Sequence, residues 1–327
     1  MKKTLIALAV LAASGASMAQ VTLYGVVDLA YGSTNAPGVN NNTAMRGNDT
    51  YNDGNSRWGI KSVEDLGSGL KFTAQFEQNI NYETGATTTS GARYAYGALS
   101  GNFGELRFGR TLSPEFFGNA TWELTGAANF SAVFNLFGFS GAANPRNDSQ
   151  FSYTTPNLGG FTGTFGYVAE QDDTQNAFAN VPSAKYSFNA IYAQGPLAIA
   201  LSGWKLDKVA TGASTDTNYS LGANYNFGSF ILAGSYQDPA GPSQGWTLGA
   251  RVPVGAWAFT ADVAQDTGYS QTNYLLYAGY SLSKRTTVYF NYDRFGKTGD
   301  QTKPARNFTT NNLQDIDNYA VGIRHNF

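Results

Sequence analysis

The chain has 327 residues, no cysteine, one histidine and a formal net charge of −2. Disulfides and metal clusters of histidine and cysteine are thereby excluded, and the slightly acidic balance offers no basic face for nucleic acid. After the amino terminus, no stretch approaches the roughly 18 consecutive apolar residues of a membrane-spanning helix. The 38 glycines, 20 tyrosines and 22 phenylalanines accompany a mean hydropathy of −0.29. This combination indicates an exported all-β chain whose apolar and polar residues alternate and cancel in the average.

The amino terminus has the three parts of a secretory signal peptide. Lys2 and Lys3 form a positive region, 4–13 an apolar region, and Ser17-Met18-Ala19 a cleavage site with small residues at the two positions that the peptidase reads. The prediction is a cleaved signal peptide over 1–19 and a mature domain over 20–327, with a charge of about −4 once the two lysines are removed. A buried amino-terminal helix is the alternative.

In chain order, alternation predicts sixteen strands in the mature domain. They begin near Val21, Ser56, Leu70, Ala92, Gly104, Asp148, Phe161, Ser183, Leu197, Thr217, Ser229, Gln244, Trp257, Thr272, Thr286 and Asp315. The connections alternate between tight turns, such as Gly67-Ser68-Gly69 and Gly195-Pro196, and long polar loops, such as 34–55 and 298–314. Short turns on one side and long loops on the other are typical of an up-and-down barrel in the outer membrane of a Gram-negative bacterium.

The prediction is therefore a transmembrane antiparallel β-barrel of 16 strands, with short periplasmic turns and long extracellular loops. In the strand 70–77, one face is Leu70, Phe72, Ala74 and Phe76, and the other is Lys71, Thr73, Gln75 and Glu77. A membrane barrel turns the apolar face to lipid and the polar face to water, whereas a soluble sandwich buries the apolar face against a second sheet. The signal peptide and the aromatic content favour the membrane barrel.

The connection 111–147 breaks the scheme, because loops of this length without structure of their own are uncommon. It is rich in aromatic residues, among them Phe116, Phe134, Phe137 and Phe139, which would be costly to leave in water. We expect this third long loop to fold into the lumen and pack on the inner wall. A loop lying over the barrel mouth, or against a neighbouring subunit, is the alternative.

Charged residues near this loop are the candidate selectivity residues. Alternation assigns five cations of the second to fifth strands to the lumen, and Arg110 stands at the junction with the loop; the set is Arg57, Lys61, Lys71, Arg93, Arg107 and Arg110. The loop carries Glu115, Glu123 and, at its end, Arg146. Arginines on one wall facing the loop carboxylates would create a transverse field that filters solutes by charge.

No catalytic arrangement is found, so the chain is not expected to be an enzyme, and neither a cofactor nor a metal is predicted. The single histidine, His325, lies in the lipid-facing set of the last strand. It has no plausible serine nucleophile and no cysteine to serve. The acidic pairs have no calcium-loop spacing, and the glycines match no phosphate-binding pattern.

The carboxyl terminus is a strand that ends within its pattern. Alternate residues put Tyr319, Val321, Ile323, His325 and Phe327 on one face and Asn318, Ala320, Gly322, Arg324 and Asn326 on the other. This suits the closing strand of a membrane barrel, although an ordinary sheet strand with one buried face is the alternative. Phe327, at a free end, is also predicted to be an assembly signal that the barrel assembly machinery binds by strand addition.

Several segments resemble the general diffusion porins of β-proteobacteria, the Gram-negative family that includes the neisserial porins. The matching segments run nearly end to end; they are Val21-Thr22-Leu23-Tyr24-Gly25-Val26-Val27-Asp28, Ser56-Arg57-Trp58-Gly59-Ile60-Lys61, Glu64-Asp65-Leu66-Gly67-Ser68-Gly69-Leu70-Lys71, Leu99-Ser100-Gly101-Asn102-Phe103-Gly104, Phe108-Gly109-Arg110, Tyr153-Thr154-Thr155-Pro156, Leu282-Ser283-Lys284-Arg285-Thr286 and Val321-Gly322-Ile323-Arg324-His325-Asn326-Phe327.

The resemblance implies a homotrimer of barrels in the lipid and lipopolysaccharide of the outer membrane, which passes ions and small hydrophilic solutes passively. It assigns constriction arginines to Arg57, Arg93 and Arg107. Counting the lumen charges predicts a weak preference for anions. A substrate-specific channel and a non-conducting barrel that serves as an adhesin or scaffold are the alternative functions.

Overall fold

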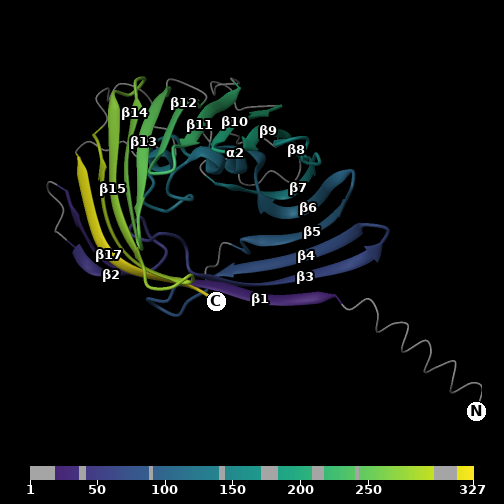
Figure 1. Ribbon diagram of the computed structural model, residues 1–327, viewed down its shortest axis with the longest axis horizontal. Coiled ribbons are helices and arrows are strands. Elements are labelled where there is room, and N and C mark those ends of the chain that lie inside the picture. The colour runs from purple at the N-terminus through teal and green to yellow at the C-terminus, as the bar shows by residue number, and fades with distance from the viewer. Residues whose placement is uncertain are drawn as a thin grey trace, which may run out of the picture.

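The computed structural model describes residues 19–36, 42–87, 91–139, 144–170, 183–207, 217–239, 243–297 and 315–327. Within these residues, a single antiparallel sheet closes on itself. Successive long strands pair with each other, and the last strand, β17 (Ile316–Asn326), pairs with the first, β1 (Gln20–Asn35). Figure 1 shows the strands arranged in a ring. The chain is therefore a closed barrel of sixteen long strands, as the alternation predicted.

The strand boundaries follow the predicted pattern closely. The remaining long strands are β3 (Arg57–Gly67), β4 (Leu70–Asn79), β5 (Tyr94–Gly101), β6 (Gly104–Leu112), β7 (Arg146–Thr154), β8 (Phe161–Val168), β9 (Lys185–Gln194), β10 (Leu197–Leu206), β11 (Asn218–Asn226), β12 (Ile231–Asp238), β13 (Gly245–Val254), β14 (Trp257–Asp266), β15 (Gln271–Ser281) and β16 (Thr286–Phe295). Each begins within two residues of its predicted start, because alternation is a local property that the barrel preserves.

One short strand was not predicted. The stretch 34–55 was expected to be a loop, but β1 continues to Asn35, and β2 (Asn42–Arg46) pairs with 30–34 of β1. The physical reason is the stagger of the barrel, since β3 pairs only with 20–26 of β1. Without β2, the far half of β1 would present an unpaired edge on this side.

The two faces of the sheet differ sharply. Leu221 of β11, Leu248 of β13 and Leu276 of β15 are 49%, 50% and 53% exposed, whereas Ser220 and Thr247, which precede two of them in the chain, are buried. An apolar outer face and a polar inner face are typical of a membrane barrel. The sandwich alternative does not fit, because the described strands form one closed sheet and no second sheet covers the apolar face.

Tight turns join the strands at one end of the barrel. The turn between β3 and β4 places Gly67, Ser68 and Gly69 at φ of +87°, +52° and +79°, a left-handed region that glycine adopts without steric cost. Antiparallel pairing puts the other set of connections at the opposite end. Most of these are longer in sequence, as predicted, but only residues 267–270 join β14 to β15, so the predicted alternation of short and long connections is not complete.

The first and last strands meet at the barrel seam. Phe327 donates its backbone N–H to Gly25 at 3.0 Å and accepts the N–H of Gly25 at 3.1 Å. A Cβ on Gly25 would lie 2.2 Å from Cζ of Phe327, so only glycine leaves room for the terminal ring. The last residue is therefore part of the closing ladder.

The connection between β6 and β7 contains two short helices, α2 (Pro114–Trp122) and α3 (Ala132–Phe137). α2 lies beside β8–β11 (Figure 1), and α3 packs against β14–β16. Among the described residues, no helix has the length and apolar character to cross a membrane.

Candidate pore constriction

Local sequence signals define the helical segment, residues 113–139. Ser113 caps α2 by accepting the N–H of Phe116 at 3.3 Å, and Pro114 occupies the first turn. Ser131 caps α3 in the same way, and Gly138 ends that helix at a φ of +63°. Both caps satisfy backbone donors that a helix start otherwise leaves free.

Polar side chains of the barrel wall bind α2 through its backbone and its polar residues. Asn189 of β9 donates to the carbonyl of Pro114 at 2.8 Å, and Asn224 of β11 donates to the carbonyl of Thr121 at 3.1 Å. Ser220 donates to Oδ1 of Asn119 at 2.8 Å. All three wall residues belong to the polar face of the sheet. The helical segment therefore lies on the face opposite the apolar belt.

A buried ion pair joins α2 to β9. Nζ of Lys185 donates to Oε1 of Glu115 at 2.7 Å and to Oδ1 of Asn147 at 2.9 Å, and lies 4.8 Å from the ring centre of Trp204. The side chains of Lys185 and Glu115 are 7% and 0% exposed. The expectation that Glu115 faces the arginines of the second to fifth strands is therefore wrong, because its carboxylate pairs with a lysine on a more distant strand.

The carboxylate of Glu123 forms its hydrogen bonds within the helical segment. Its carboxylate accepts hydrogen bonds from the N–H of Thr125 at 2.9 Å, from the N–H of Ala127 at 3.1 Å and from Oγ of Ser131 at 2.9 Å. The expectation that Glu123 faces the arginines is also wrong. Its oxygens are used to fold the turn between the two helices, which ties α3 to α2.

An apolar cluster holds α3 to the wall. Phe130, Leu136 and Phe137 are fully buried and pack with Leu275 of β15 and Tyr289 of β16. Stacking aids this contact, because the ring centres of Phe130 and Tyr277 lie 5.4 Å apart. The packing expected on the wall is present for all three phenylalanines. Phe137 belongs to this cluster, Phe134 packs against a cluster that includes Ala200 of β10, and Phe139 packs against Trp204 and Leu206 of the same strand.

Two of the predicted cations share one carboxylate. Nε of Arg93 forms an ion pair with Oε1 of Glu77, and Nε of Arg57 lies 3.6 Å from Oε2 of the same residue. Arg93 was expected within the fourth strand, but it precedes β5, and its position lets it reach back to β4. Glu77 is almost fully buried, so this cluster carries two positive charges and one negative charge.

The remaining predicted cations have different surroundings. Nη2 of Arg107 lies 2.7 Å from Oε1 of Glu105, and its guanidinium covers the ring of Tyr96 at 4.5 Å. Lys61 and Lys71 are exposed. Arg110 forms an ion pair with Asp148 at an irregularity of register between β6 and β7. This irregularity takes Arg110 out of the alternation.

A cavity of about 370 Å³ lies between the helical segment and arginines of the barrel wall. Its lining includes the predicted residues Arg57 and Arg93, together with two arginines that were not proposed, Arg146 and Arg324. Alternation placed Arg324 on the polar face of the last strand. The sequence did not indicate that this residue lines the same space as the long loop, because the two are far apart in the chain. Arg146 was noted only as a loop charge, and neither Lys61, Lys71, Arg107 nor Arg110 lines this cavity.

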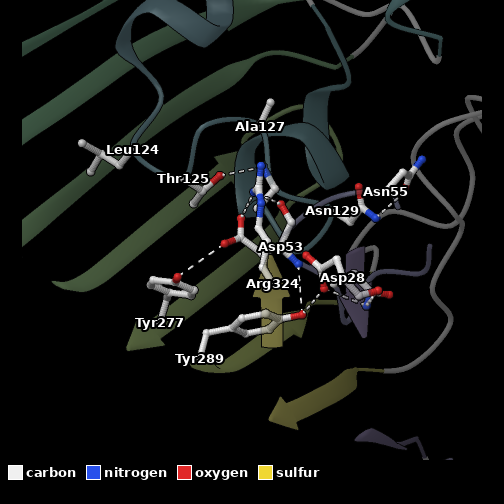
Figure 2. A network of polar contacts seen from close by, with 12 residues as sticks. Asp28, Asp53, Asn55, Leu124, Thr125, Ala127, Asn129, Tyr277, Tyr289 and Arg324 are labelled. Atoms are coloured by element: carbon white, nitrogen blue, oxygen red, sulfur yellow. Dashed lines mark hydrogen bonds and ion pairs between the residues drawn. The ribbon is translucent and has the colours of Figure 1, made fainter. Parts of the chain in front are cut away.

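The first long connection also reaches the cavity, through Asp53. Figure 2 shows Asp53 between Arg324 and Tyr277, with Tyr289 and Asp28 below. The backbone N–H of Asp53 donates to the Tyr289 hydroxyl at 3.3 Å, and that hydroxyl donates to Oδ1 of Asp28 at 2.6 Å. The network joins the first loop to β1, β16 and β17.

The helical segment is linked to the first loop as well. Asn129 donates through Nδ2 to Oδ1 of Asn55 at 2.6 Å, and its backbone N–H donates to the carbonyl of Asn52 at 3.2 Å. Figure 2 places Asn55 and Asn129 beside each other. No sequence signal pointed to this contact, because both residues lie in irregular segments.

Within the described ranges, no group of three or more histidine, cysteine, aspartate or glutamate side chains is arranged to hold a metal ion. The site consists of arginines, carboxylates, amides and aromatic rings around an open space. Such a set can attract, orient and filter charged solutes.

Comparison with known proteins gives a consistent result. A family described as Gram-negative porin matches residues 4–300. The outer membrane porin protein 32 of Delftia acidovorans is 36% identical, with the whole of both chains covered. The major outer membrane protein P.IB of Neisseria gonorrhoeae is 31% identical over 59% of this chain and 56% of its own length. Among solved structures, an anion-selective porin from Comamonas acidovorans has a TM-score of 0.74 and 28% identity, covering 95% of this chain and all of its own.

Proposed function

The chain belongs to the Gram-negative porin family, and from that premise we propose that its pore is narrowest between the helical segment and the arginines of the opposite wall. Membership of this family makes the chain an outer-membrane channel for general diffusion, and not an enzyme. The single observation that carries the proposed constriction is the 370 Å³ cavity, which is lined by Phe116 and Phe139 of the helical segment and by Arg57 and Arg93 of the barrel wall.

The docking of α2 supports an inward position of the loop. Asn189, Ser220 and Asn224, which bind α2, all stand on the polar face of the sheet. In a porin, this face encloses water. A loop over the mouth would have no such contacts in the middle of β9 and β11.

A weak preference for anions is the proposed selectivity. The cavity lining contains four arginines (Arg57, Arg93, Arg146 and Arg324) and two acids (Asp53 and Glu77), an excess of two positive charges. Exposed charges farther away than about 8–10 Å are screened at physiological salt, so the overall negative charge of the chain has less influence. The 28% identity with the anion-selective porin from Comamonas acidovorans supports this sign.

The proposed basic wall is a revised version of the predicted set. Arg57 and Arg93 form its centre, and Arg146 and Arg324 join them. Lys61 and Lys71 are assigned to the approaches on the same polar face, where they add to the potential. Arg107 is assigned to the same face, with its charge compensated by Glu105. Arg110 is left out because Asp148 neutralises it. Glu115 and Glu123 are assigned to holding the loop in place.

Shortening the loop tests the constriction. We expect deletion of 125–128, between the two helices, to raise single-channel conductance and the size limit for sugars in liposome swelling. The strands keep their hydrogen-bond ladder, so the barrel should still fold. Deletion of 83–86, at the exposed tip of another connection, is the matched control and should change neither quantity. Unchanged conductance and sugar limit in the folded 125–128 variant would contradict the proposal, and reversal potentials across a potassium chloride gradient test the sign of selectivity.

Assembly into a homotrimer in the lipid and lipopolysaccharide of the outer membrane is also proposed, from the resemblance to general diffusion porins. The barrel assembly machinery is the proposed receptor for Phe327, which ends a strand and hydrogen-bonds to Gly25. Deletion of Phe327 should lower the amount of heat-modifiable trimer in the outer membrane. Wild-type amounts would argue against the signal.

Export by a signal peptide over 1–19 is proposed as well; 1–18 lie outside the described residues. Amino-terminal sequencing of protein from the outer membrane should give Gln20 as the first residue. Any other first residue would show that cleavage occurs at a different position.

A further inference from the structure

The 370 Å³ cavity has two chemically different sides. Four arginines (Arg57, Arg93, Arg146 and Arg324) make up what we call the basic side of its lining, and the rings of Phe116 and Phe139 make up the aromatic side. Its volume lies within the range of about 300–1,000 Å³ that is usual for small-molecule sites. Selection of solutes by charge alone would not require aromatic residues in this lining.

The basic side has unused hydrogen-bond donors. In the described part of the chain, no acid forms an ion pair with Arg146, and its buried Nε has no hydrogen-bond partner. Its guanidinium lies 5.7 Å from the ring centre of Tyr94, which also lines the cavity. Arg57 shares Glu77 with Arg93. A carboxylate entering the cavity would therefore find at least one guanidinium whose charge is not already neutralised.

The aromatic side is a preformed cluster. The ring centres of Phe134 and Phe139 lie 4.6 Å apart, and those of Phe116 and Phe139 lie 5.3 Å apart. Phe116 and Phe139, which line the cavity, are only partly buried, so apolar surface is left toward it. A flat apolar ligand would remove that surface from water.

We propose that this cavity binds aromatic monocarboxylates during their passage, with the carboxylate at Arg146 and Arg57 and the ring against Phe116 and Phe139. The inference deepens the proposed pore function and rests on it. Inorganic anions would use only the basic side, and neutral sugars would use neither the unpaired charge nor the aromatic cluster. An aromatic monocarboxylate matches both sides at once.

Benzoate, acetate and benzyl alcohol separate the two sides experimentally. Acetate has the charge without the ring, and benzyl alcohol has the ring without the charge. We expect benzoate to interrupt the potassium chloride current through single channels at concentrations about tenfold lower than acetate, and benzyl alcohol to have no effect. Calorimetry on the detergent-folded protein should give the same order of affinity and does not depend on conductance.

Matched variants assign the effect to residues. Phe116→Leu should weaken benzoate binding by about 2- to 10-fold, the equivalent of one aromatic contact, with little effect on acetate. Phe117→Leu is the control, because Phe117 neighbours Phe116 on α2 but does not line the cavity. Arg146→Gln should weaken both carboxylates by about tenfold, whereas Arg285→Gln, in a short turn outside the cavity, should weaken neither.

The outcomes distinguish this inference from the proposed function. Equal binding of benzoate and acetate in a conducting pore would overturn the inference and leave the pore function intact. Binding of succinate as tightly as benzoate would also overturn it, because charge alone would then explain the site. Failure of the folded protein to conduct would contradict the pore function, and calorimetry would still decide whether benzoate is preferred.

Discussion

Nη1 of Arg324 lies 2.9 Å from Oδ1 of Asp53, although 271 residues separate them in the chain. Arg324 belongs to the last strand and Asp53 to the first long connection. Both line the 370 Å³ cavity and a second cavity of about 230 Å³, which also contains Arg251 and Tyr277. The pair therefore contributes one positive and one negative charge to the lining of both cavities, beside the proposed constriction.

Neutralising the two members should change ion selectivity in opposite directions. Asp53→Asn leaves Arg324 uncompensated and should favour anions, whereas Arg324→Gln should favour cations. A unit charge about 6 Å from the ion path contributes roughly 0.7 kcal/mol in water, or about threefold in the permeability ratio. Reversal potentials across a potassium chloride gradient measure this ratio. The double variant should return close to the wild type, and Asp315→Asn, at the exposed Arg294 pair, should have no effect.

Mild acid should increase the preference for anions. Burial raises the pKa of Asp53, although Arg324 and Arg251 oppose the shift, and Tyr277 and Tyr289 face the same residue. An acid with a raised pKa loses its negative charge at a higher pH than an ordinary aspartate as the solution is acidified. Reversal potentials measured at decreasing pH should therefore move toward anions before ordinary carboxylates titrate. An Asp53→Asn channel with the same pH response as the wild type would rule out this assignment.

Loss of the Lys185–Glu115 pair should loosen the helical segment. Lys185→Met leaves the Glu115 carboxylate buried, with Oε2 already lacking a hydrogen-bond partner. An unpaired buried charge costs about 3–5 kcal/mol, so α2 should detach part of the time. Single-channel recordings should then have larger open-channel noise and additional conductance levels. Lys205→Met, on the neighbouring strand β10, replaces an exposed lysine and should leave the recordings unchanged.

We expect the packing of Trp122 against β11 to require glycine at position 222. A Cβ on Gly222 would lie 2.3 Å from Cε2 of Trp122, which is too close for any side chain. Gly222→Ala should therefore displace the end of α2 and alter conductance without unfolding the barrel. Gly163→Ala is the control, because its nearest neighbour would be at an ordinary 3.7 Å. Equal conductance in both variants would mean that Trp122 moves without consequence.

The sequence by itself determined the barrel. Alternation within each strand needs only neighbouring residues, so the strand starts, the apolar outer face and the closing strand at Phe327 could all be predicted. The order of short and long connections was equally local. The short strand β2 was not predicted, because it forms through pairing with residues 30–34 of β1 and has no clear alternation of its own.

Only the tertiary structure decided which charges meet. The helical segment crosses to β9–β11 and β14–β16, so Glu115 pairs with Lys185. The arginines of the nearby strands pair instead with Glu77 and Glu105. Arg110 leaves the pattern at a register irregularity that alternation does not contain. Closure of the barrel also brings Arg324 beside the first loop. Strand pairing is set by local periodicity, whereas ion pairing depends on the curvature and stagger of the whole barrel, which no short stretch of sequence encodes.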